Sequence, residues 1–146
     1  MSKGFDVMTT KNGDSFCKMY KECEVDWESF GSHCYRLDNT ITKGWIDAEQ
    51  VCKEKGGHLV SVTSVEENDF IVKLHQTDFL AHFSNLWLGL DMAQAQPQWT
   101  DGVDYGYSKF GTPLGTGQGD CVELNQNGEW ERGNCTDTRF FICEKD

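Results

Sequence analysis

Four carboxylates in the last third of the chain are the first candidates for chemistry: Asp120, Glu123, Glu129 and Glu131. A pair of carboxyl groups on either side of a glycosidic bond supplies the acid and the base of a glycoside hydrolase. Alternation along a strand would, however, place Glu129 and Glu131 together on one solvent-exposed face. A solvated strand is therefore the simpler interpretation of this cluster.

Other signatures of catalysis are missing from the sequence. The histidines form no His-Glu-x-x-His motif and have no short spacing with cysteine, which argues against a zinc hydrolase. No Gly-x-Ser-x-Gly elbow and no glycine-rich phosphate loop follows a predicted strand, which argues against acyl-transfer and nucleotide enzymes. The sequence thus predicts a protein that is not an enzyme.

The chain has seven cysteines, and none of them forms a Cys-x-x-Cys pair of a zinc ribbon or a redox site. A disulfide framework is favoured, which requires an oxidising compartment and predicts a secreted or extracellular protein. The first residues, MSKGFDVMTT, contain no apolar segment of a signal peptide, so we expect a mature or trimmed chain. Six paired cysteines allow fifteen connectivities, and spacing alone does not choose among them.

The charge balance limits the possible partners. The chain has 13 basic and 24 acidic residues and a net charge of −11. Nucleic acids and anionic membrane surfaces attract positive charge, so neither is expected as a partner. The sequence also has no apolar run of about 18 residues, and we expect no membrane insertion.

Helical periodicity indicates two helices that would position the candidate groups. Trp45, Ala48 and Cys52 recur on one face of the first helix. Thr42 is a candidate cap at its start, and Gly56-Gly57 ends it. The second helix opens with the capping-box sequence Ser64-Val-Glu-Glu67 and ends before Phe79.

Short strands are predicted in most of the remaining chain, at residues 35–37, 58–62, 86–90, 98–100, 122–124, 129–131 and 139–142. Asn127-Gly128 is typical of a tight hairpin turn. In the strand before it, Val122 and Leu124 alternate with Glu123, as in a half-buried strand. Residues 103–119 hold five glycines and Pro113 and predict a long irregular loop, a kind of segment that is usually functional.

The organisation is that of one α+β domain preceded by a tail. Residues 1–22 are polar and without periodicity, and they predict an N-terminal tail that contains Cys17. Residues 23–146 predict two helices followed by many short, mostly antiparallel strands joined by disulfides. Cys17 is either a free thiol or the site of an intermolecular bridge that links two chains into a homodimer.

The order and spacing of several landmarks resemble a C-type lectin-like domain of the long form, over residues 23–145. The landmarks include Trp87-Leu-Gly-Leu90, Trp99-Thr-Asp-Gly102, Gly128-Glu-Trp130 and Phe141-Ile-Cys-Glu144. The resemblance implies a fold with two helices, small antiparallel sheets, a long irregular loop and three disulfides. The implied pairs are Cys23–Cys34, Cys52–Cys143 and Cys121–Cys135, which leaves Cys17 unpaired.

The resemblance also implies where a sugar-binding member would hold calcium. The positions are a triplet in the long loop, the residue two before Cys121, and the two residues after Trp130. Here they are occupied by Thr112-Pro113-Leu114, Gly119, and Glu131-Arg132. Calcium needs six to eight oxygen ligands, and Leu114 and Gly119 offer no side-chain oxygen. The positive charge of Arg132, at about 5 Å from a calcium ion, would oppose binding of the ion by roughly 6–7 kcal/mol at an effective dielectric of about 20.

We therefore expect no metal and no cofactor, with calcium not favoured, in an extracellular recognition module that binds a glycan or a protein. The residues expected at the binding surface are Tyr105, Tyr107, Phe110, Thr112, Pro113, Leu114, Asp120, Glu131 and Arg132. The three aromatic residues either contact the ligand or form a small core of the loop itself. Calcium-assisted sugar binding through unconventional ligands, and a structural or surface-binding protein, are the alternatives.

Overall fold

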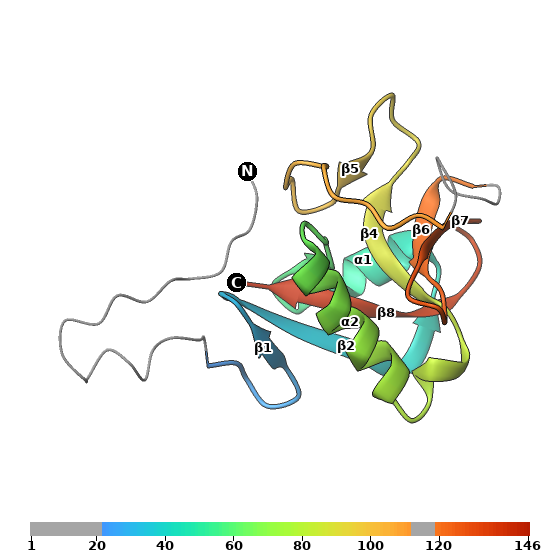
Figure 1. Ribbon diagram of the computed structural model, residues 1–146. Coiled ribbons are helices and arrows are strands. Elements are labelled where there is room, and N and C mark those ends of the chain that lie inside the picture. Colours follow the sequence, from blue (N-terminus) through green and yellow to red (C-terminus); the bar gives the residue numbers. More distant parts are fainter. Residues whose placement is uncertain (1–21, 112–118) are drawn as a thin grey trace, which may run out of the picture.

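The computed structural model describes residues 22–111 and 119–146 (Figure 1). Four residues that the sequence indicated as candidates lie outside the described residues: Cys17 and the loop triplet Thr112, Pro113 and Leu114. So does the predicted tail, apart from its last residue. Within the described residues, no helix is long and apolar enough to cross a membrane.

The described chain has two α-helices, one 3-10 helix and eight strands. The helices are α1 (Trp45–Glu54), α2 (Val65–Thr77) and the 3-10 helix η2 (Ala81–Phe83). The strands are β1 (Glu28–Phe30), β2 (His33–Lys43), β3 (His58–Leu59), β4 (Leu86–Asp91), β5 (Gln98–Trp99), β6 (Cys121–Leu124), β7 (Trp130–Gly133) and β8 (Arg139–Lys145). The predicted α+β class and the two helices are confirmed.

The strands join in one hydrogen-bonded sheet in the order β1-β2-β8-β4-β6-β7, with β3 paired to β8 and β5 to β4 (Figure 1). All pairs are antiparallel except β4 with β8. The last strand thus lies between the first long strand and the β4-β6-β7 group. This arrangement makes β8 the centre of the domain.

The helix signals differ in how well they match the structure. Half of the predicted capping box is present in α2: the Ser64 hydroxyl accepts a hydrogen bond from the Glu67 N–H at 3.1 Å, whereas the Glu67 carboxylate accepts from the Thr63 N–H at 2.8 Å. The predicted role of Thr42 is wrong, because Thr42 belongs to β2 and Gly44 precedes α1 without a side-chain cap. Strand β2 continues to Lys43, and the N-cap position of α1 is Gly44, so Thr42 lies two residues before the position from which a side chain could cap the helix.

A buried hydrogen bond ties α2 to the sheet. The Tyr35 hydroxyl donates to Glu67 Oε2 at 2.5 Å, and both side chains are almost fully buried. Burial raises the pKa of the Tyr35 hydroxyl, and the carboxylates of Glu144 and Glu67 raise it further. Both effects favour the protonated hydroxyl, the form in which Tyr35 donates its hydrogen bond to Glu67.

Tryptophans belong to both hydrophobic core clusters of the domain. Trp130 packs with Trp99 in the larger cluster, and Trp87 lies with Trp45 in the smaller one. The indole N–H of Trp45 donates to the Leu88 carbonyl at 2.7 Å, and that of Trp130 donates to Asn68 Oδ1 at 2.9 Å. Burial of the Trp45 and Trp130 rings with their N–H groups paired fixes α1 and α2 on the sheet.

The three disulfides that the resemblance implied are all present. Cys23 is bonded to Cys34, Cys52 to Cys143, and Cys121 to Cys135. The second of these joins α1 to β8 across 91 residues of sequence. It therefore connects the first helix to the strand at the centre of the sheet.

The connection between α2 and β4 depends on Asp78. Its carboxylate accepts hydrogen bonds from the N–H groups of Leu80 and Ala81 at 3.0 and 2.7 Å and from the Asn39 amide. Partial burial pushes the pKa of the Asp78 carboxyl upward, but the Ala81, Asn39 and Leu80 hydrogen bonds outweigh it and lower this pKa. The ionised form is therefore the one that stabilises the connection.

We expect Asp78→Ala to lower the free energy of unfolding by about 1 kcal/mol at pH 7, as for loss of a helix cap. Because the folded-state pKa is depressed, the contribution of Asp78 is complete above the unfolded-state pKa and is lost as the pH falls through the folded-state value. Urea denaturation at pH 7 and in acid should show the difference from wild type shrinking in acid. Asp69→Ala, at an exposed position of α2, should have little effect on stability. If Asp78→Ala loses the same free energy of unfolding at pH 7 and in acid, the stabilising role of the ionised Asp78 carboxylate is contradicted.

Candidate functional site

The described part of the long loop runs along Trp130 at the start of β7. The Trp130 N–H donates to the Lys109 carbonyl at 2.9 Å, and the Gly111 N–H donates to the Trp130 carbonyl at 3.4 Å. Phe110 and Trp130 form an isolated parallel β-bridge. The loop is thus attached to the hairpin of β6 and β7, the stretch in which the sequence placed the candidate carboxylates.

The loop aromatics turn toward the core and are not freely exposed. Tyr107 and Phe110 both contact Trp130 edge to face, with ring centroids 5.8 and 5.5 Å apart, and Tyr105 is also half-buried. Burial raises the pKa of the Tyr107 hydroxyl, and the carboxylates of Asp69 and Glu66 add to this. The three loop aromatics therefore pack against the main hydrophobic core of the domain, and a separate small core of the loop is not what the described residues form.

Arg132 stands at one of the positions where the resemblance placed a calcium ligand, and it contacts Gly119, which stands at another. Its Nε donates to the Gly119 carbonyl at 2.7 Å, and its Nη2 lies 3.3 Å from Asp120 Oδ1. The Arg132 side chain is 28% exposed and that of Asp120 57%, so the ion pair is at the surface. The guanidinium thereby takes up a carbonyl and a carboxylate oxygen, two groups that a cation would otherwise use.

Gly119 adds a steric obstacle to a metal ligand. Its φ is +131°, in the region that favours glycine, and a Cβ placed there would lie 2.0 Å from the Gly133 carbonyl oxygen. Any side chain at this position would force the backbone of β7 to move. An acidic side chain, which the resemblance would place here, does not fit the local backbone.

Glu131 lies apart from Arg132, although the two are neighbours in sequence. Glu131 accepts hydrogen bonds from the side-chain amides of Asn125 and Asn85, at 2.9 and 3.4 Å. Successive side chains of a strand point to opposite faces, so Arg132 and Glu131 serve different surfaces. The structure therefore brings together Asp120 and Arg132, and it places Glu131 on the other face of β7. It sets Tyr107 and Phe110 against Trp130 and Tyr105 against the same core cluster.

The described residues do not fit a calcium site at this place. No group of three or more His, Cys, Asp or Glu side chains within residues 22–111 and 119–146 could hold a metal ion. Asp91, at the end of β4, accepts a hydrogen bond from the Ala93 N–H at 2.8 Å. Together with Arg132 and Gly119, this leaves the described part of the chain without the oxygen-rich cage that calcium requires.

The predicted half-burial of the β6 strand is wrong. Glu123 is only 3% exposed and is held by Arg139 Nε at 3.0 Å and by the Asn85 amide at 2.9 Å. Strand β6 lies between β4 and β7, and all four of its residues are buried. Glu131 is half-buried as well, so the predicted solvated face of acidic residues is not present on this side of the described hairpin.

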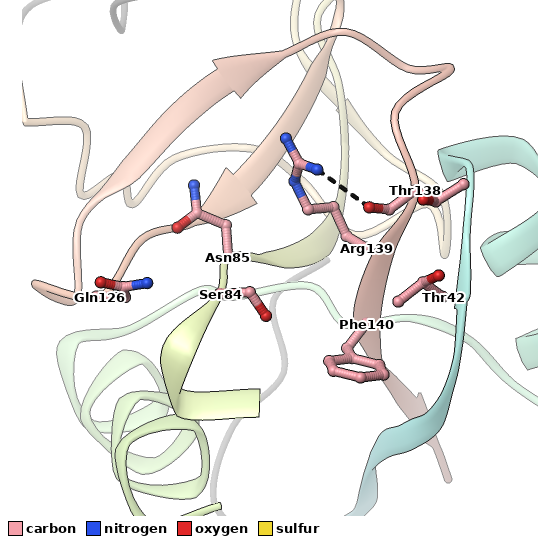
Figure 2. Close-up of a pocket in the computed structure, with 7 residues that line it drawn as sticks. All are labelled: Thr42, Ser84, Asn85, Gln126, Thr138, Arg139 and Phe140. Carbon is pink, nitrogen blue, oxygen red and sulfur yellow. Dashed lines mark hydrogen bonds between the residues drawn. The ribbon is translucent and has the colours of Figure 1, made fainter. Parts of the chain in front are cut away.

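Beside this buried ion pair is a pocket of about 300 Å³ that sequence reasoning did not predict (Figure 2). It is lined by Thr42, Ser84, Asn85, Gln126, Thr138, Arg139 and Phe140. These residues come from the end of β2, the start of β8 and the connections before β4 and after β6. No local pattern could have indicated the pocket, because each contributing segment supplies only one to three residues.

Comparison with known proteins gives a consistent picture. The family model described as "Lectin C-type domain" matches residues 41–145 of the chain. The α chain of the snaclec bitiscetin from Bitis arietans is 34% identical over 129 residues, which cover 84% of this chain and 94% of the relative. One chain of the snaclec coagulation factor IX/factor X-binding protein from Echis carinatus is 35% identical over 140 residues, covering 84% of this chain and 99% of the relative.

Solved structures show the same likeness. The carbohydrate-recognition domain of the mouse scavenger receptor C-type lectin superimposes with a TM-score of 0.73 at 29% sequence identity, covering 85% of this chain and 96% of that one. The relatives are lectin-like recognition proteins and not enzymes. The range that the family model matches includes both α-helices, strands β3 to β8 and the hairpin that carries Arg132.

Proposed function

The chain belongs to the family of C-type lectin domains, and from this premise we propose that it is an extracellular module that recognises a protein surface without calcium. The proposed contact surface is the long loop together with Asp120 and Arg132. The observation that carries the proposal is the bonding of the Arg132 guanidinium to the Gly119 carbonyl and the Asp120 carboxylate. The positively charged Arg132 side chain thus binds the oxygen atoms that a calcium ion would need as ligands.

Two further observations support a protein ligand without calcium. The described part of the loop backbone is held on Trp130 by two hydrogen bonds between protein groups. A relative covered over almost its whole length is described by its name as binding coagulation factors, which are proteins. The three disulfides agree with an oxidising, extracellular location.

We expect no saturable calcium binding by this chain. Calcium chloride titrated into the EDTA-treated protein should give no binding heat, and a millimolar concentration should leave the melting temperature unchanged. A ligand that binds only the folded state would raise the melting temperature by mass action. Saturable calcium binding that depends on Asp120 would contradict the proposal.

Ligand class can be tested with arrays of protein ectodomains and of glycans, each probed with calcium and with EDTA. We expect binding to an ectodomain that persists in EDTA and weakens at least tenfold in Arg132→Ala, because charge-assisted contacts at an interface are commonly worth more than about 1.4 kcal/mol. Arg36→Ala is the matched control, since Arg36 also lies beside a carboxylate, Asp26, at 3.8 Å. Glycan binding that EDTA abolishes would favour a calcium-dependent lectin instead.

A further inference from the structure

The turn between β7 and β8 contains the one Asn-x-Ser/Thr sequence of the chain, Asn134-Cys135-Thr136. An asparagine with a serine or threonine two residues later, and no proline between them, is the acceptor sequence for N-linked glycans in secreted proteins. The three disulfides agree with passage of this chain through an oxidising secretory route. The structure shows what each of the three side chains does in the fold.

The two residues that the modification needs are at the surface. Asn134 and Thr136 are exposed, whereas Cys135 between them is half-buried and bonded to Cys121 of β6. The Cys135 carbonyl also accepts a hydrogen bond from the Trp45 N–H at 2.9 Å, which ties the turn to the start of α1. The disulfide thus holds only the middle residue of the sequence and leaves its two functional side chains accessible.

The Asn134 amide is held in one orientation by Thr136. Its Oδ1 accepts hydrogen bonds from the Thr136 N–H at 3.0 Å and from the Thr136 hydroxyl at 2.8 Å. Within residues 22–111 and 119–146, Asn134 Nδ2 has no hydrogen-bond partner. Nδ2 is the atom that would bond a sugar, so exchange of one of its hydrogens for a sugar breaks no hydrogen bond of the described fold.

Other asparagines of the described chain do not combine these features. Four of them use the amide nitrogen as a donor inside the fold: Asn39, Asn68, Asn85 and Asn125. Asn127 is exposed in the turn between β6 and β7, but Glu129 stands where the acceptor sequence has a hydroxyl. Asn134 therefore joins an exposed amide nitrogen, free of hydrogen bonds to the described residues, to a hydroxyl group two residues later.

We propose that Asn134 carries an N-linked glycan, an inference that rests on the proposed extracellular location. The donor is an oligosaccharide linked to a lipid through a diphosphate. Asn134 Nδ2 forms a bond to C1 of the first sugar, and the bond between C1 and the diphosphate oxygen breaks. The lipid diphosphate leaves with the bonding electron pair, and the Nδ2 proton passes to a base of the transferring enzyme. The product has a bulky hydrophilic group on the turn between β7 and β8.

The proposal can be tested by intact-mass spectrometry of the full chain, secreted from cultured animal cells with an added signal peptide. Most wild-type molecules should carry extra mass that peptide N-glycosidase removes, with ¹⁸O incorporated at position 134 when the digestion is done in ¹⁸O-labelled water. Asn134→Gln and Thr136→Val should lack this mass. Thr136→Ser should retain it, because serine also supplies the hydroxyl.

Asn127→Gln is the matched control, because Asn127 is exposed in the neighbouring turn but lacks the hydroxyl two residues later. It should be glycosylated like wild type. Secreted wild-type protein without a glycan at Asn134 would overturn the proposal, and so would a glycan that persists in Thr136→Val or is lost in Thr136→Ser. The measurement involves no binding partner, so its result does not depend on whether the Arg132 surface recognises a protein.

Discussion

Removal of the Cys52–Cys143 disulfide is expected to lower the free energy of unfolding by about 4–5 kcal/mol. The bond closes a loop spanning 91 residues of sequence, so the reduced unfolded chain would gain much conformational freedom. Both cysteines are fully buried between α1 and β8. The double variant Cys52→Ala/Cys143→Ala avoids unpaired thiols, and urea denaturation followed by tryptophan fluorescence gives the free energy.

The matched comparison is Cys23→Ala/Cys34→Ala, which opens a bridge between residues only 11 apart in sequence. The chain-entropy relation gives about 3 kcal/mol for a loop of this size. The first bridge should therefore cost clearly more than the second. Equal losses would mean that native-state packing around the sulfurs, rather than the freedom of the unfolded chain, determines the stabilisation.

Much of the fold could be predicted because its signals are local. Ser64 and Glu67 mark the start of α2 within four residues, and the apolar run at Leu86–Leu90 marks β4. The disulfide pairing needed the resemblance, since fifteen connectivities were possible from the cysteines alone. Joining of all strands into one sheet around β8 was not predicted, because it depends on pairings between residues far apart in the chain.

The errors at the site have physical causes of two kinds. Glu123 is buried because β4 and β7 flank its strand and Arg139 neutralises it, and both partners are remote in sequence. The grouping of Glu131 with Arg132 ignored the alternation of side chains along β7, which the sequence did contain. A period of two along this strand would already have placed Arg132 and Glu131 on opposite sides.

Gly119→Ala is expected to lower the free energy of unfolding by about 3 kcal/mol. Two costs add: a φ of +131°, which L side chains rarely adopt, and a Cβ only 2.0 Å from the Gly133 carbonyl oxygen. The backbone shift needed to relieve this contact would also move the Gly119 carbonyl away from Arg132 Nε. Urea denaturation measures the loss of stability.

Gly106→Ala in the same long loop is the matched control, because a Cβ at Gly106 meets nothing within 4 Å. It should leave stability unchanged within about 0.5 kcal/mol. A Gly119→Ala variant as stable as Gly106→Ala would mean that the backbone at Gly119 adapts easily. An acidic side chain could then be accommodated there, and the steric argument against a calcium ligand would fail. A large loss at Gly119 alone would support the view that this hairpin is shaped for an internal arginine in place of a metal.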